Sequence, residues 1–293
     1  MIRKFVQTLA CLVIGAGAAQ AAPLTVEVMQ TGAGSLFTSI TLVKGEKGAV
    51  LVDAPFTRAD AHRVVAWVLE SGKHLDAIYV THDHPDHFFS MEVITQAFPD
   101  AKVYAAPQVV DDIWKSIPMK IKRWSPMLGA NGPRYPTAPE PVKDGVITLE
   151  GERLEVVGPM QGDHAHCTAL WIPSAKTLIA GDILFNEVHL WLGESLQPER
   201  KAWAASVDRL AALGAKTVVA GHKKPGLPDD TSALAYTKNY LVRFEKAVAE
   251  SKTSAELRAK INAAFPQTID LLGDFLLGNS SRVAMREDPP WQE

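Results

Sequence analysis

Hydrophobic and polar positions alternate with two different periods along the chain. Short apolar runs such as 49–52 and 75–80 indicate buried strands, and residues 58–71 repeat apolar positions at the spacing of an amphipathic helix. Strands that alternate with helices in both halves predict a layered α/β domain. Further strands are expected within 39–44, 102–106, 145–159, 168–173, 177–185 and 215–222, and further helices within 90–98, 107–117, 199–213 and beyond 229.

One long stretch, residues 118–141, follows neither period. It is rich in proline, glycine and bulky side chains, so we expect a loop. Connections of this length without regular structure are usually functional lids or disordered. Trp124, Met127 and Tyr135 favour a lid over an apolar pocket, and an insertion packed on the surface is the alternative.

The N-terminus has the pattern of a secretory signal peptide. A basic start at Arg3 and Lys4 precedes an apolar stretch that ends in the small residues around Ala21. We therefore expect residues 1–21 to be removed, giving a periplasmic or secreted protein without a stable membrane anchor. An uncleaved anchor or a lipoprotein signal at Cys11 is the alternative. The remaining chain divides into a main domain, 22–250, and a C-terminal helical extension and tail, 251–293.

Composition narrows the class of partner. Without the signal peptide Cys167 is the only cysteine, so no intramolecular disulfide can form and a hydrophobic core must stabilise the fold. The net charge of −3 comes from well-mixed acidic and basic residues, which argues against a nucleic-acid partner. A small-molecule substrate is therefore expected, and the sequence does not indicate an oligomeric state.

The densest group of polar residues reads THDHPDH at positions 81–87. It follows the strand expected at 75–80 and so lies in a loop at a strand end, where several side chains can converge on one point. Imidazole and carboxylate groups are ligands that suit zinc. The motif therefore predicts a metal site. The four ligands that it offers are His82, His84, Asp86 and His87.

Later segments place more potential ligands at strand ends. His164 and His166 precede a strand, and Asp182 and His222 each follow one. His-x-His-x-Asp-His followed in order by a histidine, a Gly-Asp and a late Gly-His resembles the metallo-β-lactamase superfamily, over roughly 26–228. This resemblance implies a four-layer αββα sandwich with its active site along one edge of the two sheets.

The resemblance also implies two metal ions that share seven ligands. Zinc suits the many imidazoles, and iron or manganese would leave the fold unchanged. The ligands are His82, His84 and His166 for one ion, Asp86, His87 and His222 for the other, and Asp182 as the bridge.

Four further residues are expected beside the ligands. Asp53, at the end of an early strand, matches the family's aspartate that hydrogen-bonds near the ligands, and a helix-capping role is the alternative. His164 is the rival of His166 as a ligand and otherwise lines the pocket or lies exposed. His189 and Trp191 follow the strand that carries Asp182 and either line the substrate pocket or simply pack.

Two adjacent metal ions would lower the pKa of a shared water and polarise the substrate, so that hydroxide is the nucleophile. Asp86 and Asp182 are the expected catalytic carboxylates, which position the hydroxide and carry a proton to the leaving group. The pattern with Asp182 favours hydrolysis of an ester, lactone or related acyl bond. A β-lactamase, a phosphodiesterase and a non-catalytic zinc-binding protein are the alternatives.

Overall fold

The computed structural model describes residues 23–292, so the proposed signal peptide lies outside the described residues. One sheet has the strand order β1-β2-β3-β4-β5-β6, in which β1 to β3 pair antiparallel and β3 to β6 pair parallel. This sheet carries the first part of the polar motif at the end of β4. Its strands are β1 (Thr25–Gln30), β2 (Ser39–Lys44), β3 (Gly48–Val52), β4 (His74–Val80), β5 (Lys102–Ala105) and β6 (Glu140–Pro141).

The second sheet has the order β12-β10-β9-β8-β7, and β11 with β13 forms a separate two-stranded sheet. Strand β10 runs parallel to β12, whereas the remaining neighbours in this sheet are antiparallel. Its strands are β7 (Val146–Leu149), β8 (Glu152–Met160), β9 (Cys167–Ile172), β10 (Thr177–Ile179) and β12 (Thr217–Val219); the pair is β11 (Phe185–Asn186) and β13 (His222–Lys223).

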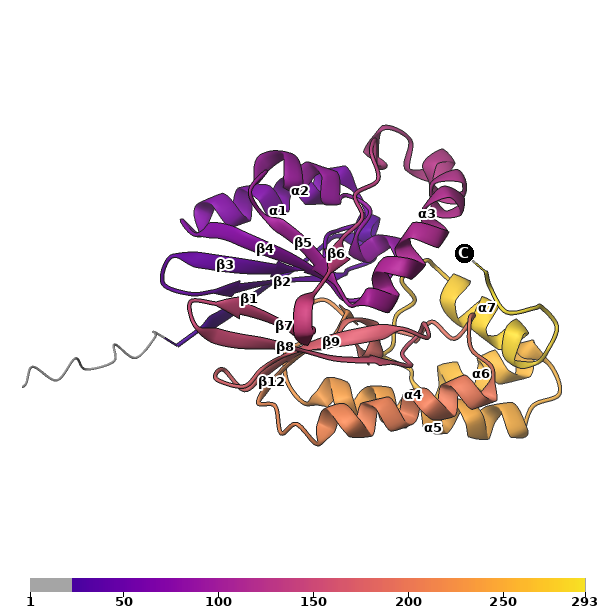
Figure 1. The fold of residues 1–293 in the computed structure, drawn as a ribbon. Helices are drawn as coiled ribbons and strands as arrows, with labels where there is room; N and C mark the ends of the chain where they lie inside the picture. Colours follow the sequence, from indigo (N-terminus) through magenta and orange to yellow (C-terminus); the bar gives the residue numbers. More distant parts are fainter. Residues whose placement is uncertain (1–22, 293) are drawn as a thin grey trace, which may run out of the picture.

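Helices cover the outer faces of the two sheets. In Figure 1, α1, α2 and α3 lie above the first sheet and α4 and α5 lie below the second, with α6 and α7 beside them. The helices are α1 (Arg58–Glu70), α2 (Met91–Ala97), α3 (Pro107–Leu128), α4 (Gln197–Ala211), α5 (Ser232–Ala249), α6 (Ser254–Ala264) and α7 (Phe275–Ala284).

Three separate layers of buried side chains show the order of packing. Val50 and Tyr79 of the first sheet share one apolar cluster with Leu170 of the second, so the two sheets face each other. A second cluster joins the first sheet to α1, α2 and α3, and a third joins the second sheet to the later helices. The expected αββα sandwich is therefore confirmed.

Helix α3 corrects the expected loop at 118–141, because it continues through Pro118 and Pro126 to Leu128. A proline inside a helix removes one backbone hydrogen bond and usually ends the helix. Here Ile117, Ile121 and Trp124 repeat at helical spacing and pack against the core above the first sheet. Tertiary packing thus stabilises a helix that local sequence signals disfavour.

The C-terminal segment 251–293 is helical over α6 and α7, as expected. Its Leu257, Ile261 and Leu277 belong to the same apolar cluster as the second sheet, so the segment packs into the core of the main domain. Among residues 23–292, no helix combines the length and the hydropathy needed to cross a membrane.

Candidate metal centre

The loop after β4 delivers the motif to the edge where the two sheets meet. The chain leaves β4 at Val80, His84 has an extended backbone, and Pro85–His87 form one short turn of 3-10 helix. This change of backbone direction separates the first two histidines from Asp86 and His87. All four side chains are buried.

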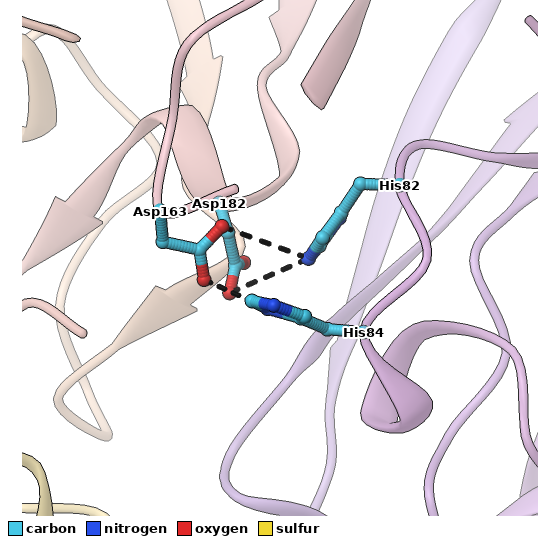
Figure 2. Close-up of side chains that lie close together, drawn as sticks. All are labelled: His82, His84, Asp163 and Asp182. Carbon is cyan, nitrogen blue, oxygen red and sulfur yellow. Dashed lines mark ion pairs between the residues drawn. The ribbon is translucent and has the colours of Figure 1, made fainter. Parts of the chain in front are cut away.

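The first cluster consists of His82, His84, Asp163 and Asp182, which Figure 2 shows converging from two sides. Nδ1 of His84 lies 2.9 Å from Oδ2 of Asp163. Nε2 of His82 lies 3.9 Å from Asp163 and 3.8 Å from Asp182. Four ligands around one zinc ion would stand roughly 3.4 Å apart, given metal–ligand distances of about 2.1 Å, so these separations suit a cation.

The second cluster consists of Asp86, His87 and His222, with Asp182 between it and the first. Nε2 of His222 lies 3.2 Å from both Asp86 and Asp182. Nε2 of His87 lies 3.1 Å from the other oxygen of Asp182. One carboxylate oxygen of Asp182 therefore faces both clusters and the second oxygen faces His87, which is the arrangement expected of a bridging residue.

Unsatisfied polar atoms test whether these residues fit metal ions. Nε2 of His82, Oδ2 of Asp163 and Oδ1 of Asp182 are buried and make no hydrogen bond. Leaving a buried polar atom without a partner costs about 1–3 kcal/mol, more when the group is charged. The three residues belong to one cluster whose ligand atoms lie within 4.8 Å of one another, so the donor set fits a divalent cation.

The structure does not bring His166 to either buried cluster. Its side chain is 43% exposed, and its Nδ1 lies 2.5 Å from Asp112 of α3. Asp163 instead occupies the place beside His82 and His84 that we expected His166 to fill. The signal that we missed is Gly162-Asp163, which stands in the loop at the position where we sought a histidine.

Asp163 is held in place by two neighbours. The thiol of the buried Cys167 donates a weak hydrogen bond of 3.4 Å to Oδ1 of Asp163, and Gly162 lies against the same sulfur. Burial, opposed by His84 and helped by Asp182, raises the pKa of Asp163 to about 7 in the metal-free protein. A bound cation would favour the charged carboxylate and so offset this cost.

Burial and opposite charges also set the protonation of the other ligands. Burial lowers the pKa of His82 well below its usual value, and His87 adds to this effect. For His84, burial alone would lower the pKa, but Asp163 and Glu194 raise it well above its usual value. Such strong and opposite shifts in adjacent histidines are typical of a functional site.

Asp53 lies where the resemblance implied. Its carboxylate accepts hydrogen bonds from the backbone N–H and the hydroxyl of Thr81 and lies 2.8 Å from Nδ1 of His87. The backbone of Asp53 has a φ of 66°, in the left-handed region that residues other than glycine rarely adopt. These contacts orient the ring of His87 and leave its Nε2 facing Asp182.

Gly221, directly before β13, allows the backbone there to approach Asp182 closely. A Cβ atom at this position would lie 1.9 Å from Oδ1 of Asp182. No side chain can be accommodated there without displacing the carboxylate. The glycine of the Gly-His pair is therefore required by packing at the site itself.

Glu194, which no sequence pattern indicated, links the first cluster to His164. One carboxylate oxygen lies 3.1 Å from Nε2 of His84, and the other lies 3.1 Å from Nδ1 of His164. Trp191 donates a hydrogen bond of 3.0 Å to the same carboxylate. His164 therefore contacts the candidate ligand His84 through Glu194 and does not belong to the first cluster.

His189 is not part of the pocket lining that was one of its two expected roles. Its side chain is buried against Tyr240 of α5, whose hydroxyl lies 2.8 Å from Nδ1. Burial lowers the pKa of His189 to about 4, with a smaller effect of Arg258. His189 thus faces the core, whereas Trp191, two residues later, lines the pocket.

A pocket opens directly above the two clusters. Its polar floor comprises His84, Asp86, Asp163, Asp182, Glu194 and His222. Its walls are apolar and come from α3, from the segment around Trp191 and from the C-terminal segment. The larger apolar side chains are Leu36, Phe56, Trp124, Phe185, Trp191, Leu271, Leu272, Phe275, Leu276 and Trp291.

Comparison with known proteins decides the family. A family model described as the metallo-beta-lactamase superfamily matches residues 33–222, which is more than half of the chain. The chain belongs to the metallo-beta-lactamase superfamily. Members of this superfamily are metal-dependent hydrolases, and the His/Asp clusters of this chain are candidate metal sites of that kind.

Relatives within the superfamily include enzymes of different specificity. The chain is 26% identical over 230 residues to a hydroxyacylglutathione hydrolase of Aliivibrio salmonicida (strain LFI1238), covering 76% of this chain and 77% of the relative. It is 25% identical over 210 residues to a metallo-beta-lactamase type 2 of Pseudomonas aeruginosa, covering 71% and 74%. These relatives act on different acyl compounds according to their names.

Solved structures agree on the fold. A metallo-beta-lactamase family protein from Thermus thermophilus superposes with a TM-score of 0.62 at 22% identity, covering 90% of this chain and 93% of that chain. The crystal structure of DIM-1 metallo-beta-lactamase superposes with a TM-score of 0.54 at 20% identity, covering 76% and 99%. The sandwich is therefore common to proteins of low sequence identity.

Proposed function

We propose that this superfamily member is an exported dinuclear zinc hydrolase that cleaves an ester, lactone or related acyl bond of an uncharged small molecule. The observation that carries the substrate class is the pocket, in which a polar floor of potential ligands lies under apolar walls. Among the described residues that line it, none is lysine or arginine. Arg123 is outside this lining, and its guanidinium lies over the ring of Trp291.

In this proposal one ion would be held by the first cluster, through His82, His84 and Asp163, and the other by Asp86, His87 and His222. Asp182 would contact both. Imidazole-rich sites suit zinc, whereas the third carboxylate, Asp163, makes the set more favourable to iron or manganese than three histidines would be. Elemental analysis decides between these metals.

Two bound cations would supply Lewis acidity, which lowers the pKa of water and polarises a carbonyl oxygen. The chain supplies the proton transfers and the orientation. Asp86 lines the pocket and accepts a hydrogen bond of 3.2 Å from Thr38, which fixes its carboxylate next to His222. From there Asp86 takes the proton of the attacking water and delivers it to the leaving group.

The apolar walls bind and shield the acyl group. Trp191 and Phe275 stack with ring centroids 5.5 Å apart, and Phe56 and Trp124 meet edge to face at 5.4 Å. Aromatic side chains of this kind bind apolar groups and exclude water from the reacting bond. A substrate with an aliphatic or aromatic acyl group therefore fits better than a charged one.

Hydrolysis of a β-lactam or a glutathione thioester is the less favoured reaction. Both compounds carry carboxylates, and a carboxylate that lies against the apolar walls, away from the two proposed cations, meets no lysine or arginine of the lining and loses hydration without compensation. The names of the two sequence relatives support hydrolysis of an acyl bond in general. The lining of this pocket supports an uncharged acyl compound.

A substrate panel tests the proposal. Metal-replete protein is assayed on a lactone, an aryl ester, a cephalosporin and a phosphodiester, with metal content measured on the same preparation. The proposal predicts turnover of the lactone or the aryl ester well above the other two. Cephalosporin cleavage far above the rest would contradict it, as would fully loaded protein that cleaves none of the four.

Export is a separate part of the proposal and rests on the sequence of residues 1–21. N-terminal sequencing of the protein secreted from its native host or from a bacterial expression host tests it. A mature chain that starts near Ala22 is expected. A full-length chain retained in the cytoplasm would contradict it.

A further inference from the structure

His164 and His166, which the two clusters leave unused, meet two aspartates from other segments. His166 pairs with Asp112 of α3, and Nε2 of His164 lies 3.6 Å from the same Asp112 oxygen. Asp83, from the loop after β4, brings Oδ1 to 3.4 Å from Nε2 of His164. The ligand atoms of Asp112, His164 and His166 thus lie within 4.8 Å of one another, and Asp83 adjoins this group through His164.

We propose that Asp83, Asp112, His164 and His166 form a third divalent-cation site, separate from the two clusters on the pocket floor. Zinc is the cation that this set of two imidazoles and two carboxylates suits best. The inference rests on these four residues alone and does not depend on the reaction proposed above.

The buried carboxylate of Asp83 is the main support for a ligand at this place. The side chain is 5% exposed, and its Oδ1 makes no hydrogen bond. Its other oxygen is satisfied by Ser116 and Lys120. A buried carboxylate oxygen without a hydrogen bond is costly, so a cation between Oδ1 and Nε2 of His164 would stabilise the site.

The orientation of His164 also favours a cation. Its Nδ1 lies 3.1 Å from Glu194, which leaves Nε2 facing Asp83 and Asp112. Histidines that bind metals usually donate their other ring N–H to a carboxylate in this way. When the ring is neutral, this contact places the proton on Nδ1 and leaves the lone pair on Nε2, where the cation would bind in place of a proton.

The distances need only a small adjustment. The separations of 3.4 and 3.6 Å around Nε2 of His164 match the roughly 3.4 Å expected between ligands of one zinc ion. The contact of 2.5 Å between His166 and Asp112 is shorter and must widen. His166 is half exposed on a loop before β9, so its ring can rotate without disturbing the core.

Zinc titration of the holoenzyme tests the proposal. Protein that already holds its tightly bound ions is titrated with Zn²⁺ in competition with a chromophoric chelator. One additional equivalent is expected for the wild type. Its affinity should fall at least about tenfold in His166→Ala and in Asp112→Asn, because even indirect partners of a metal ligand are worth that much.

Two matched variants control for loss of any surface histidine or carboxylate. His62→Ala removes an exposed histidine of α1, and Asp111→Asn removes the exposed neighbour of Asp112. Both should retain the additional equivalent. If the wild type takes up no additional equivalent, the four residues form an ion-pair network only and the proposal is overturned. An additional equivalent that persists in both site variants would overturn it as well.

A second measurement keeps the proposal testable if a site variant fails to fold. Wild-type crystals soaked in Zn²⁺ should show an anomalous peak at the zinc edge next to Nε2 of His164, beyond any peaks on the pocket floor. Absence of that peak in crystals whose floor sites are loaded would refute the third site. The floor peaks report on the proposed dinuclear centre separately, so the two proposals can fail independently.

Discussion

The floor and the walls of the pocket are built in different ways. The floor consists of polar and charged side chains from strand ends and from loops that follow or precede strands, and two of its six residues, His84 and Asp86, come from the single motif THDHPDH. The walls consist of apolar side chains from α3, the segment around Trp191 and residues 271–291. This difference indicates that the floor determines which chemistry is available and that distant segments determine which substrate enters.

The C-terminal part of the wall shows how far this assembly extends along the chain. The ring of Trp291 packs edge to face against Trp191 and Phe275, with centroids 5.9 and 5.4 Å apart. Its backbone N–H donates to Gly193 at 2.8 Å. Arg123 of α3 lies 4.3 Å from the same ring. Trp291 thus connects three segments that meet over the metal centre.

The largest effect is expected on the floor, from Asp182→Asn. The change keeps the shape but removes the charge that faces both clusters. Loss of one stabilising group of this kind typically lowers kcat by about 10²–10³-fold, or roughly 2.7–4 kcal/mol. We expect folded protein with weakened metal binding, checked by circular dichroism, elemental analysis and hydrolysis of the preferred ester or lactone. The exposed Asp100→Asn is the control, and equal activity of the two variants would contradict a bridging role.

A second change on the floor separates Asp163 from His166. We expect Asp163→Ala to lose one of the two tightly bound ions, because it removes a buried ligand next to His82 and His84. His166→Ala should keep both tight ions, since its ring lies outside the cluster. Elemental analysis after dialysis distinguishes the outcomes. The reverse pattern would make His166 the ligand and contradict the role of Asp163.

An intermediate effect is expected from Glu194→Gln, because Glu194 connects the candidate ligand His84 on the floor to Trp191 on the wall. Its carboxylate contacts His84 and His164 and accepts from Trp191. Losing such a partner of a ligand typically costs about 10–100-fold in metal affinity or activity. Chelator competition measures the affinity, with the exposed Glu70→Gln as a matched control. An affinity unchanged from wild type would show that Glu194 only packs.

The smallest effect is expected on the wall, from Trp291→Ala. Aromatic pairs are worth about 0.5–1.5 kcal/mol beyond the area that they bury, which corresponds to roughly 2–10-fold. We expect KM for an aromatic ester to rise by this factor while metal content stays the same. Trp114→Ala, at a tryptophan that is 63% exposed, is the control. A loss of metal or an unchanged KM would contradict the role of Trp291 as part of the wall.

The sequence predicted the floor better than the walls because the floor is encoded locally. The spacing of THDHPDH, Gly-Asp and Gly-His is enough to place most candidate ligands at strand ends, and the family resemblance that it carries implies the four layers. Asp163 was missed because a nearby histidine matched the pattern of the family more closely. Only the three-dimensional path of the loop shows that His166 faces away from the cluster.

The walls could be predicted only in part, at Trp124 and Trp191, because their residues meet only after folding. Pro118 and Pro126 indicated a loop, yet packing of Trp124 and its neighbours maintains a helix there. The contribution of Trp291 depends on contacts with Trp191 and α7, which no local pattern indicates. The two expected roles of His189, pocket lining and packing, could not be separated for the same reason, since only the folded path of the chain shows that its side chain faces the core.

A matched pair of esters tests the central claim most directly. 4-Nitrophenyl butyrate and 4-nitrophenyl hydrogen succinate have acyl chains of equal length and differ in a terminal carboxylate. Metal-replete wild-type protein should hydrolyse the butyrate with a kcat/KM at least about tenfold higher, since burying an unpaired carboxylate costs more than about 1.4 kcal/mol. Equal values, or a preference for the succinate, would contradict an apolar pocket that selects uncharged acyl compounds.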